Sequence, residues 1–337
     1  MPLLVRETFW GSNRAVELGH GSGHDGPAPA CPGNTLDAAL VHAWIAGKRK
    51  MSLWGSLFKI NFIVLILCGI GCEVIGWSDE RKEEMNVPYR TSNYPLMVIA
   101  HRGFSGSAPE NTLIAFLKAL EIGSDMVELD VQLSKDREVM VFHDDTLERT
   151  TNGWGRVVDY TLTDLKTLDA GSRLAAQFAG ERIPTLREVL DLVRGRCLVN
   201  IEIKHPNHGL YPITDLVDRA LLEVKNVGML DEVIFSSFNP SALDWIKKNE
   251  PLVRVAVLFH HSWRSLTEVT GGKDYKVLNL RKDYLTEEKI AQIHHQGLKV
   301  NVYTLNSDEE LEQFVRWQVD GIITNHPDRL IRILKKK

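Results

Sequence analysis

Cysteine is scarce in this chain, and neither sign of charge is in excess. The 337 residues include four cysteines (Cys31, Cys68, Cys72 and Cys197), which have neither the paired spacing of a zinc site nor the density of a disulfide framework. Lys and Arg total 40 against 44 Asp and Glu, so the formal net charge is -4. Such a chain has no basic field for a nucleic-acid backbone, and we expect no nucleic-acid partner.

Proline and glycine, at 13 and 25 residues, are too few for a collagen-like or low-complexity chain. With 44% hydrophobic residues, a chain of this length can bury one large core or two medium ones. The sequence therefore predicts a folded globular protein.

The first 50 residues show no sustained hydrophobic period, and residues 19–33 are rich in Gly, Pro, Ala and His. We interpret residues 1–50 as an unstructured N-terminal extension. A basic cluster at 48–50 precedes Met51, and an apolar run at 62–72 follows it, which is typical of a targeting segment. Met51 is therefore an alternative native start.

We interpret residues 51–77 as a hydrophobic signal or anchor segment, followed by a charged linker at 78–95. The apolar run of about a dozen residues is shorter than the roughly 20 that a spanning helix needs, which leaves a cleaved signal and a membrane anchor both open. Lipidation at Cys72 is a less favoured alternative. We expect export or membrane anchoring, with membrane association through residues 60–77.

Short apolar runs alternate with helix-length segments over residues 96–335, which is typical of an α/β fold. Strands are predicted at 97–100, 126–133, 139–142, 198–204, 233–236, 253–258, 277–280, 300–305 and 321–324. Only five residues, 134–138, separate the second run from the third, so these two must form an antiparallel hairpin. The remaining eight strands predict a (β/α)8 TIM barrel, with a doubly wound sheet as the alternative.

Acidic residues and histidines stand at the carboxyl ends of the predicted strands, where a barrel of this kind places its functional groups. They are His101 and Arg102 after the first run, Glu128 and Asp130 in the second, His143 after the third, and Glu202 and Lys204 in the fourth. Residues i and i+2 of a strand share a face, so three carboxylates converge if that face lines the barrel mouth. A hairpin turn centred on Asp136 and Arg137 would place His143 directly opposite Asp130.

Three converging carboxylates need a cation, and an all-oxygen ligand set favours Mg²⁺ or Ca²⁺ over Zn²⁺. Arg102 and Lys204 can hold an anion beside this metal, and His101 and His143 can act as base and acid. The natural substrate of such a site is a phosphate ester.

Each of these features also has a purely structural interpretation. A lone histidine is more often structural than catalytic, and the pair Glu202 and Lys204 could be an ion pair of little worth. Asn111 is interpreted as the N-cap of a helix at 112–122, and residues 324–328 as a turn before the last helix. A purely structural interpretation requires charged residues to stand at the ends of several apolar strands by accident. We therefore favour a functional site.

The ordered set of motifs resembles the glycerophosphodiester phosphodiesterase family from about residue 96 to 333. The motifs are Ala100-His101-Arg102-Gly103, Pro109-Glu110-Asn111-Thr112, Glu128-Leu129-Asp130-Val131, Phe142-His143-Asp144, Ile201-Glu202-Ile203-Lys204 and the segment 320–328. Tyr303 departs from the pattern, since similar sequences often have tryptophan there.

The resemblance implies a TIM barrel with a small insertion, here about 145–184, after the second barrel strand and its hairpin. It implies that His101 and His143 are the catalytic acid and base, that Glu128, Asp130 and Glu202 bind the metal, and that Arg102 and Lys204 bind the phosphate. It further implies metal-dependent hydrolysis of glycerophosphodiesters to sn-glycerol 3-phosphate and an alcohol. Two alternatives stay open: a phosphodiesterase acting on lysophospholipid, sphingomyelin or inositol lipid, and a non-catalytic binding barrel. The sequence does not predict the oligomeric state.

Overall fold

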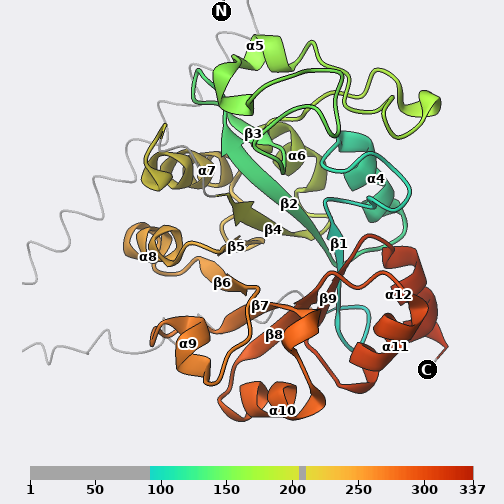
Figure 1. Ribbon diagram of the computed structural model, residues 1–337, viewed down its shortest axis with the longest axis vertical. Coiled ribbons are helices and arrows are strands. Elements are labelled where there is room, and N and C mark those ends of the chain that lie inside the picture. Colours follow the sequence, from blue (N-terminus) through green and yellow to red (C-terminus); the bar gives the residue numbers. More distant parts are fainter. Residues whose placement is uncertain (1–91, 205–209, 337) are drawn as a thin grey trace, which may run out of the picture. The chain divides into compact units, whose positions relative to one another are not determined.

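The computed structural model describes residues 92–204 and 210–336 (Figure 1). The predicted extension at 1–50, the hydrophobic segment at 51–77 and most of the linker at 78–95 lie outside these residues. Within residues 92–204 and 210–336, no helix is both long enough and apolar enough to cross a membrane.

Eight parallel strands form a closed barrel, and a ninth strand is joined to it as a hairpin arm. The strands are β1 (Met97–His101), β2 (Met126–Leu133), β3 (Val139–Val141), β4 (Leu198–Ile203), β5 (Val233–Ser237), β6 (Arg254–Phe259), β7 (Val277–Arg281), β8 (Lys299–Tyr303) and β9 (Gly321–Thr324). β1 pairs with both β2 and β9, which closes the ring. The predicted TIM barrel is thereby confirmed, and the doubly wound alternative is wrong because an open sheet has no such closure.

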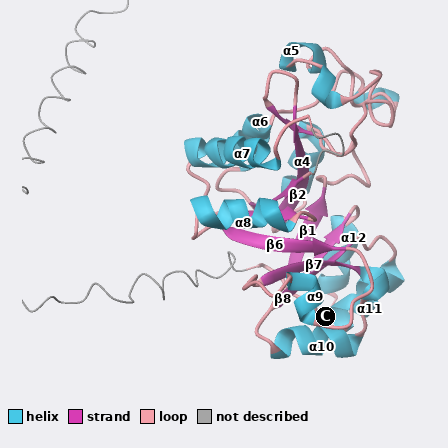
Figure 2. Ribbon diagram, turned by 60° about the vertical axis from the view of Figure 1, so that its left-hand side comes forward, coloured by secondary structure: helices cyan, strands magenta, loops and turns pink. Residues whose placement is uncertain are grey.

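Helices lie around the outside of the strands (Figures 1 and 2). They are α4 (Leu113–Glu121), α6 (Leu186–Val193), α7 (Ile213–Val227), α8 (Pro240–Asn249), α9 (Leu266–Thr270), α10 (Glu287–His295), α11 (Asp308–Arg316) and α12 (Pro327–Lys335). Many begin at a side chain that accepts a bond from a free N–H of the first turn: Thr185 for α6, Asn239 for α8, Thr286 for α10 and Ser307 for α11. These caps fix the residues at which the helices start.

The barrel has two apolar regions, one between the strands and the helices and a smaller one that fills the amino-terminal half of the barrel interior. The smaller region consists of Met97, Ile99, Met126, Leu198, Ile234, Ala256, Val277 and Ile323. Polar side chains such as Glu128, Asn200 and Ser236 follow on the same strands and are also buried. Apolar side chains thus fill the barrel interior near the amino ends of the strands, and polar side chains occupy it near their carboxyl ends.

The hairpin register differs from the prediction by one residue. Val131 pairs with Val141, and the Phe142 N–H donates to the Asp130 carbonyl, so Phe142 and not His143 lies opposite Asp130. The cause is a three-residue loop, in which the Arg137 N–H donates to the Ser134 carbonyl and Arg137 has φ +68°. His143 follows the end of β3 and reaches the barrel mouth through a change of chain direction.

The chain between β3 and α6 forms the predicted insertion. It contains α5 (Leu162–Leu165) and two 3-10 turns, Val157–Asp159 and Ala176–Phe178. Its apolar side chains, including Leu147, Leu165 and Ile183, form a third buried cluster with Met140 and Phe142 of the hairpin. The insertion therefore has a small core of its own, attached to the strand end that leads to His143.

Candidate active site

Strand pairing brings the predicted acidic residues together. His101 at the end of β1 is in register with Glu128 of β2, and Asp130 of β2 is in register with Glu202 of β4. Ligand atoms of Glu128, Asp130 and Glu202 all lie within 4.8 Å of one another. The structure therefore groups the three carboxylates that we predict to bind a metal.

The electrostatics of these carboxylates would suit a bound cation. Burial raises the pKa of Glu128 well above its usual range, and repulsion from Asp130 and Glu202 adds to this effect. Burial and the Asp130 charge likewise raise the pKa of Glu202. Burial also opposes ionisation of Asp130, but the cations of Arg102 and Lys204 outweigh it and lower its pKa to about 2. A divalent ion would relieve this repulsion.

The hydrogen-bonding state of Asp130 also fits a metal ligand. Its Oδ2 accepts from Asn111 Nδ2 at 3.0 Å, whereas the buried Oδ1 accepts no hydrogen bond from the described residues. Lys204 Nζ is 3.6 Å from this Oδ1 and donates to Glu202 Oε1 at 3.0 Å. A buried carboxylate oxygen without a donor beside two further carboxylates suits Mg²⁺ or Ca²⁺, which take oxygen ligands.

Arg102 is held in an uncommon backbone conformation at the centre of the site. Its φ is +55°, and its N–H donates to Glu128 Oε2 at 2.9 Å. Its guanidinium contacts Glu110 Oε1 at 2.8 Å through Nη1 and Asp130 Oδ2 at 3.2 Å through Nε. Gly103 continues the turn with φ +77°, and a Cβ there would lie 2.6 Å from the backbone of Ala115 in α4. The turn thus needs glycine and points Arg102 at two acidic groups.

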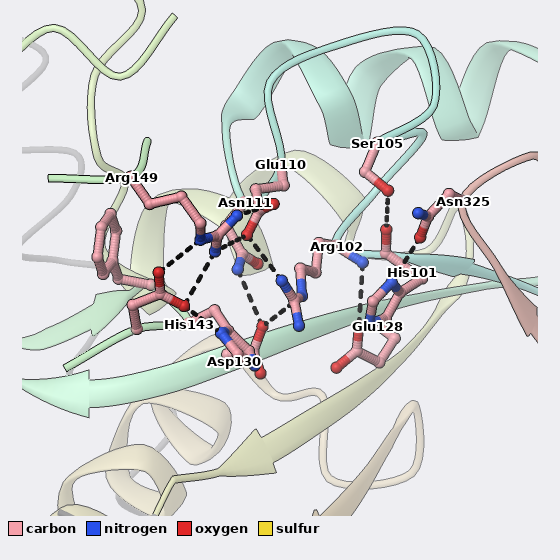
Figure 3. Close-up of polar contacts among 12 residues, drawn as sticks. His101, Arg102, Ser105, Glu110, Asn111, Glu128, Asp130, His143, Arg149 and Asn325 are labelled. Atoms are coloured by element: carbon pink, nitrogen blue, oxygen red, sulfur yellow. Dashed lines mark hydrogen bonds and ion pairs between the residues drawn. The ribbon is translucent and has the colours of Figure 1, made fainter. Parts of the chain in front are cut away.

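His101 is fixed by the last strand of the barrel. Its Nδ1 lies 2.6 Å from Oδ1 of Asn325, which follows β9, and its Nε2 lies 3.9 Å from Glu128 Oε2 (Figure 3). Because an amide oxygen only accepts, the proton sits on Nδ1 and Nε2 is unprotonated in the neutral ring. Burial lowers the pKa of His101 to about 4, and the Arg102 cation adds to this effect.

His143 is held by a chain of charged contacts that starts in the insertion. Its Nδ1 lies 2.5 Å from Asp144 Oδ1, and Arg149 binds both oxygens of Asp144 through Nε at 2.5 Å and Nη2 at 3.0 Å. Arg149 also donates twice to Glu110, at 2.7 Å each, and Glu110 in turn binds Arg102 (Figure 3). Burial opposes ionisation of Asp144, but the hydrogen bonds from His143 and Arg149 outweigh it and lower its pKa. This network links the two ends of the site.

Five residues of this arrangement were not predicted to act in the site: Glu110, Asn111, Asp144, Arg149 and Asn325. The interpretation of Asn111 as a helix cap is wrong: Thr112 caps α4, and Asn111, with φ +57°, bonds Asp130 instead. An arginine and a glutamate 39 positions apart carry no sequence signal of their contact. Glu110, Asp144 and Asn325 did lie in motifs of the resemblance, and the position of these motifs beside site residues was the available signal.

Six of the seven predicted site residues line one cavity of about 200 Å³ at the barrel mouth: His101, Arg102, Glu128, His143, Glu202 and Lys204. The seventh, Asp130, is buried and contacts Arg102 and Lys204, which belong to that lining. The structure thus unites the acidic, basic and histidine groups around one space.

Residues 101–329 match the Glycerophosphoryl diester phosphodiesterase family. The chain belongs to this family. A glycerophosphodiester phosphodiesterase from Caldanaerobacter subterraneus subsp. tengcongensis is 38% identical over 247 residues, which are 71% of this chain and 98% of that protein. One from Bacillus altitudinis is 36% identical over 241 residues, 70% of this chain and 97% of that protein.

Solved structures of this family share the fold. One is a phosphodiesterase from Oleispira antarctica, determined in complex with the product sn-glycerol-3-phosphate. It superposes with a TM-score of 0.67 at 31% sequence identity, and the match covers 72% of this chain and 97% of that one. The family and the enzyme class predicted from the ordered motifs are confirmed. The individual roles of the site residues stay predictions.

Proposed function

We propose that this chain hydrolyses glycerophosphodiesters to sn-glycerol 3-phosphate and an alcohol, with a divalent metal and with His101 and His143 as the acid and base. The observation that carries the proposal is the convergence of three buried carboxylates, two histidines and two cations on one cavity, in a chain that belongs to the glycerophosphodiester phosphodiesterase family.

Glu128, Asp130 and Glu202 would hold the metal, as the unbonded Oδ1 of Asp130 and the mutual repulsion of the three carboxylates suggest. When bound, Mg²⁺ or Ca²⁺ would polarise the phosphoryl group and offset its charge. The protein supplies the remaining charge: Arg102 and Lys204 bind the non-bridging oxygens and stabilise the charge that develops on them in the transition state.

The two histidines move the protons. Each is held at Nδ1, His101 by Asn325 and His143 by Asp144, so each presents Nε2 for proton transfer. One Nε2 removes the proton from the nucleophile, and the other donates a proton to the leaving alkoxide. If the nucleophile is water, sn-glycerol 3-phosphate forms directly. If it is the glycerol 2-hydroxyl, a cyclic phosphate forms as the alcohol leaves, and water then opens it to sn-glycerol 3-phosphate. The histidine whose alanine variant recovers activity on a diester with a p-nitrophenol leaving group is the acid, because that leaving group needs no proton.

Choline release from glycerophosphocholine by the purified full-length chain tests the proposal. We expect release that EDTA abolishes and that Mg²⁺ or Ca²⁺ restores. Lysophosphatidylcholine, which differs by its acyl chain and releases the same product, tests the lipid alternative in the same assay. Release from the lysolipid alone would reject the glycerophosphodiester as substrate, and release that persists in EDTA would reject the metal.

We also propose that residues 51–77 export the chain or anchor it to a membrane. The apolar run at 62–72 after a basic cluster supports this proposal. Fractionation of cells that express the full chain, compared with a variant lacking 51–77, tests it. An unchanged distribution between the two would reject it.

A further inference from the structure

A second cavity, of about 450 Å³, adjoins the active-site cavity of about 200 Å³. Phe238, Tyr303 and Thr304 line both, so the two cavities share one wall. The smaller volume lies below the roughly 300–1,000 Å³ typical of small-molecule sites. A phosphodiester carries two arms, and the second cavity provides space for the arm that the first does not accommodate.

The first cavity suits the glycerol arm. Oδ1 of Asn200 and Oγ of Ser236 are buried, belong to residues that line this cavity, and have no hydrogen-bond partner among the described residues. Glycerol hydroxyl groups can bond to both atoms, which would satisfy them. The alcohol arm is then left to the second cavity.

The second cavity lies on the opposite half of the barrel mouth from the carboxylates. Its walls come from the ends of β5 to β8: Phe238 follows β5, His260 follows β6, Arg281 ends β7 and Tyr303 ends β8. The Phe238 ring lies edge-on to His260, with centroids 4.8 Å apart. None of Glu128, Asp130 and Glu202 lines this cavity.

Basic side chains outnumber acidic ones in its lining, which includes Arg281, Lys282 and Asp283. Lys282 forms an ion pair with Glu310, which does not line the cavity. Arg281 is the better anion ligand, because it uses Nε to bind Asp283 at 2.5 Å and its Nη groups make no hydrogen bond to the described residues. Its side chain is 52% exposed, so a ligand can reach it.

We propose that this second cavity is the subsite for the alcohol arm of the substrate, and that Arg281 favours alcohols that carry an anionic group. The inference rests on the proposed hydrolysis of glycerophosphodiesters and adds to it a class of alcohol. Arg281 would contact the anion equally before and during the reaction, so its contribution should appear in KM and not in kcat.

The test compares two substrates that differ by one carboxylate, glycerophosphoserine and glycerophosphoethanolamine. Release of sn-glycerol 3-phosphate by the full-length chain in excess metal is measured for both. We expect kcat/KM to favour the serine ester by about fivefold through a lower KM, the size of an accessible Arg–carboxylate pair. Arg281→Gln should bring this ratio close to one, and Arg281→Glu should reverse it.

Lys276→Gln is the matched control. Lys276 precedes the amino end of β7, whereas Arg281 ends the same strand, and it is paired with Asp274 in an exposed position outside this cavity. The control removes the same charge and should leave the ratio unchanged. A wild-type ratio near or below one, or the same ratio in Arg281→Gln as in wild type, overturns the inference while glycerol phosphate is still released. Hydrolysis of neither ester by the wild type overturns the proposed function itself.

Discussion

Replacement of Arg149 by glutamine should lower turnover although the side chain touches none of the proposed metal ligands. Arg149 holds both oxygens of Asp144, and Asp144 holds Nδ1 of His143. Without Arg149, Asp144 can rotate away, and His143 loses the partner that fixes its ring and its tautomer. Arg149 is therefore a positioning residue for the proposed acid–base pair.

The size of the effect follows from the contacts. Hydrogen bonds to charged groups contribute about 1.5–3 kcal/mol each when buried. Arg149 is 47% exposed, so solvent screening reduces the sum of its two bonds to Asp144 to about 1–2 kcal/mol. If this energy orients His143 in the transition state, kcat should fall by about 5- to 30-fold.

Steady-state kinetics on glycerophosphocholine with saturating metal measures this loss. Arg156→Gln is the control, because the Arg156 side chain makes a similar two-bond contact with Asp159 in the insertion, at 2.8 Å each, and neither residue lines the active-site cavity. The variants should share the same secondary structure by circular dichroism. Equal kcat values for Arg149→Gln and Arg156→Gln would refute the positioning role.

Three further predictions concern the site. His101→Ala and His143→Ala should each reduce kcat by about 10²–10⁴-fold with the fold intact, the range for a lost acid or base. Glu202→Gln should raise the Mg²⁺ or Ca²⁺ concentration needed for half-maximal activity, because it removes one anionic ligand. The stability difference between wild type and Arg149→Gln should be complete above the unfolded pKa values of Asp144 and Glu110, about 3.9 and 4.3, and should vanish as pH falls through their lower folded pKa values.

Each of these has an opposing result. Near-normal turnover of either histidine variant would remove that histidine from the acid–base pair. An unchanged metal dependence in Glu202→Gln would remove Glu202 from the ligand set. For the third, chemical denaturation at several pH values is the measurement, and a stability difference that grows toward acid pH would contradict the ionised state of Asp144.

The barrel could be predicted from the sequence because each strand is a short apolar run and the chain between runs has helical length. The hairpin register could not, because a three-residue loop is normally signalled by Gly or Asn in the left-handed position. Here that position is Arg137, with φ +68°. The expected nearness of His143 to the carboxylates therefore proved right for a different structural reason.

The seven predicted site residues were visible because each stands in or next to a strand and interrupts an apolar pattern with charge. The residues that hold them give no such signal. Arg149 and Asn325 lie in loops, where polar residues are common and interrupt no apolar pattern. Their contacts depend on tertiary structure, since the insertion must fold against Glu110 and the last strand must close on the first. The strand pattern therefore predicts the proposed catalytic and ligand-binding residues better than the loop residues that hold them in position.

The contact between His101 and Asn325 joins residues 224 positions apart, across the seam where the barrel closes. During synthesis, His101 leaves the ribosome long before Asn325 does. Nearly all of the barrel must therefore be synthesised before His101 can form this contact. A nascent chain that already carries every proposed metal ligand would still lack this contact. The barrel closes, and His101 gains this partner, only when the final strand has been made and has docked on the first.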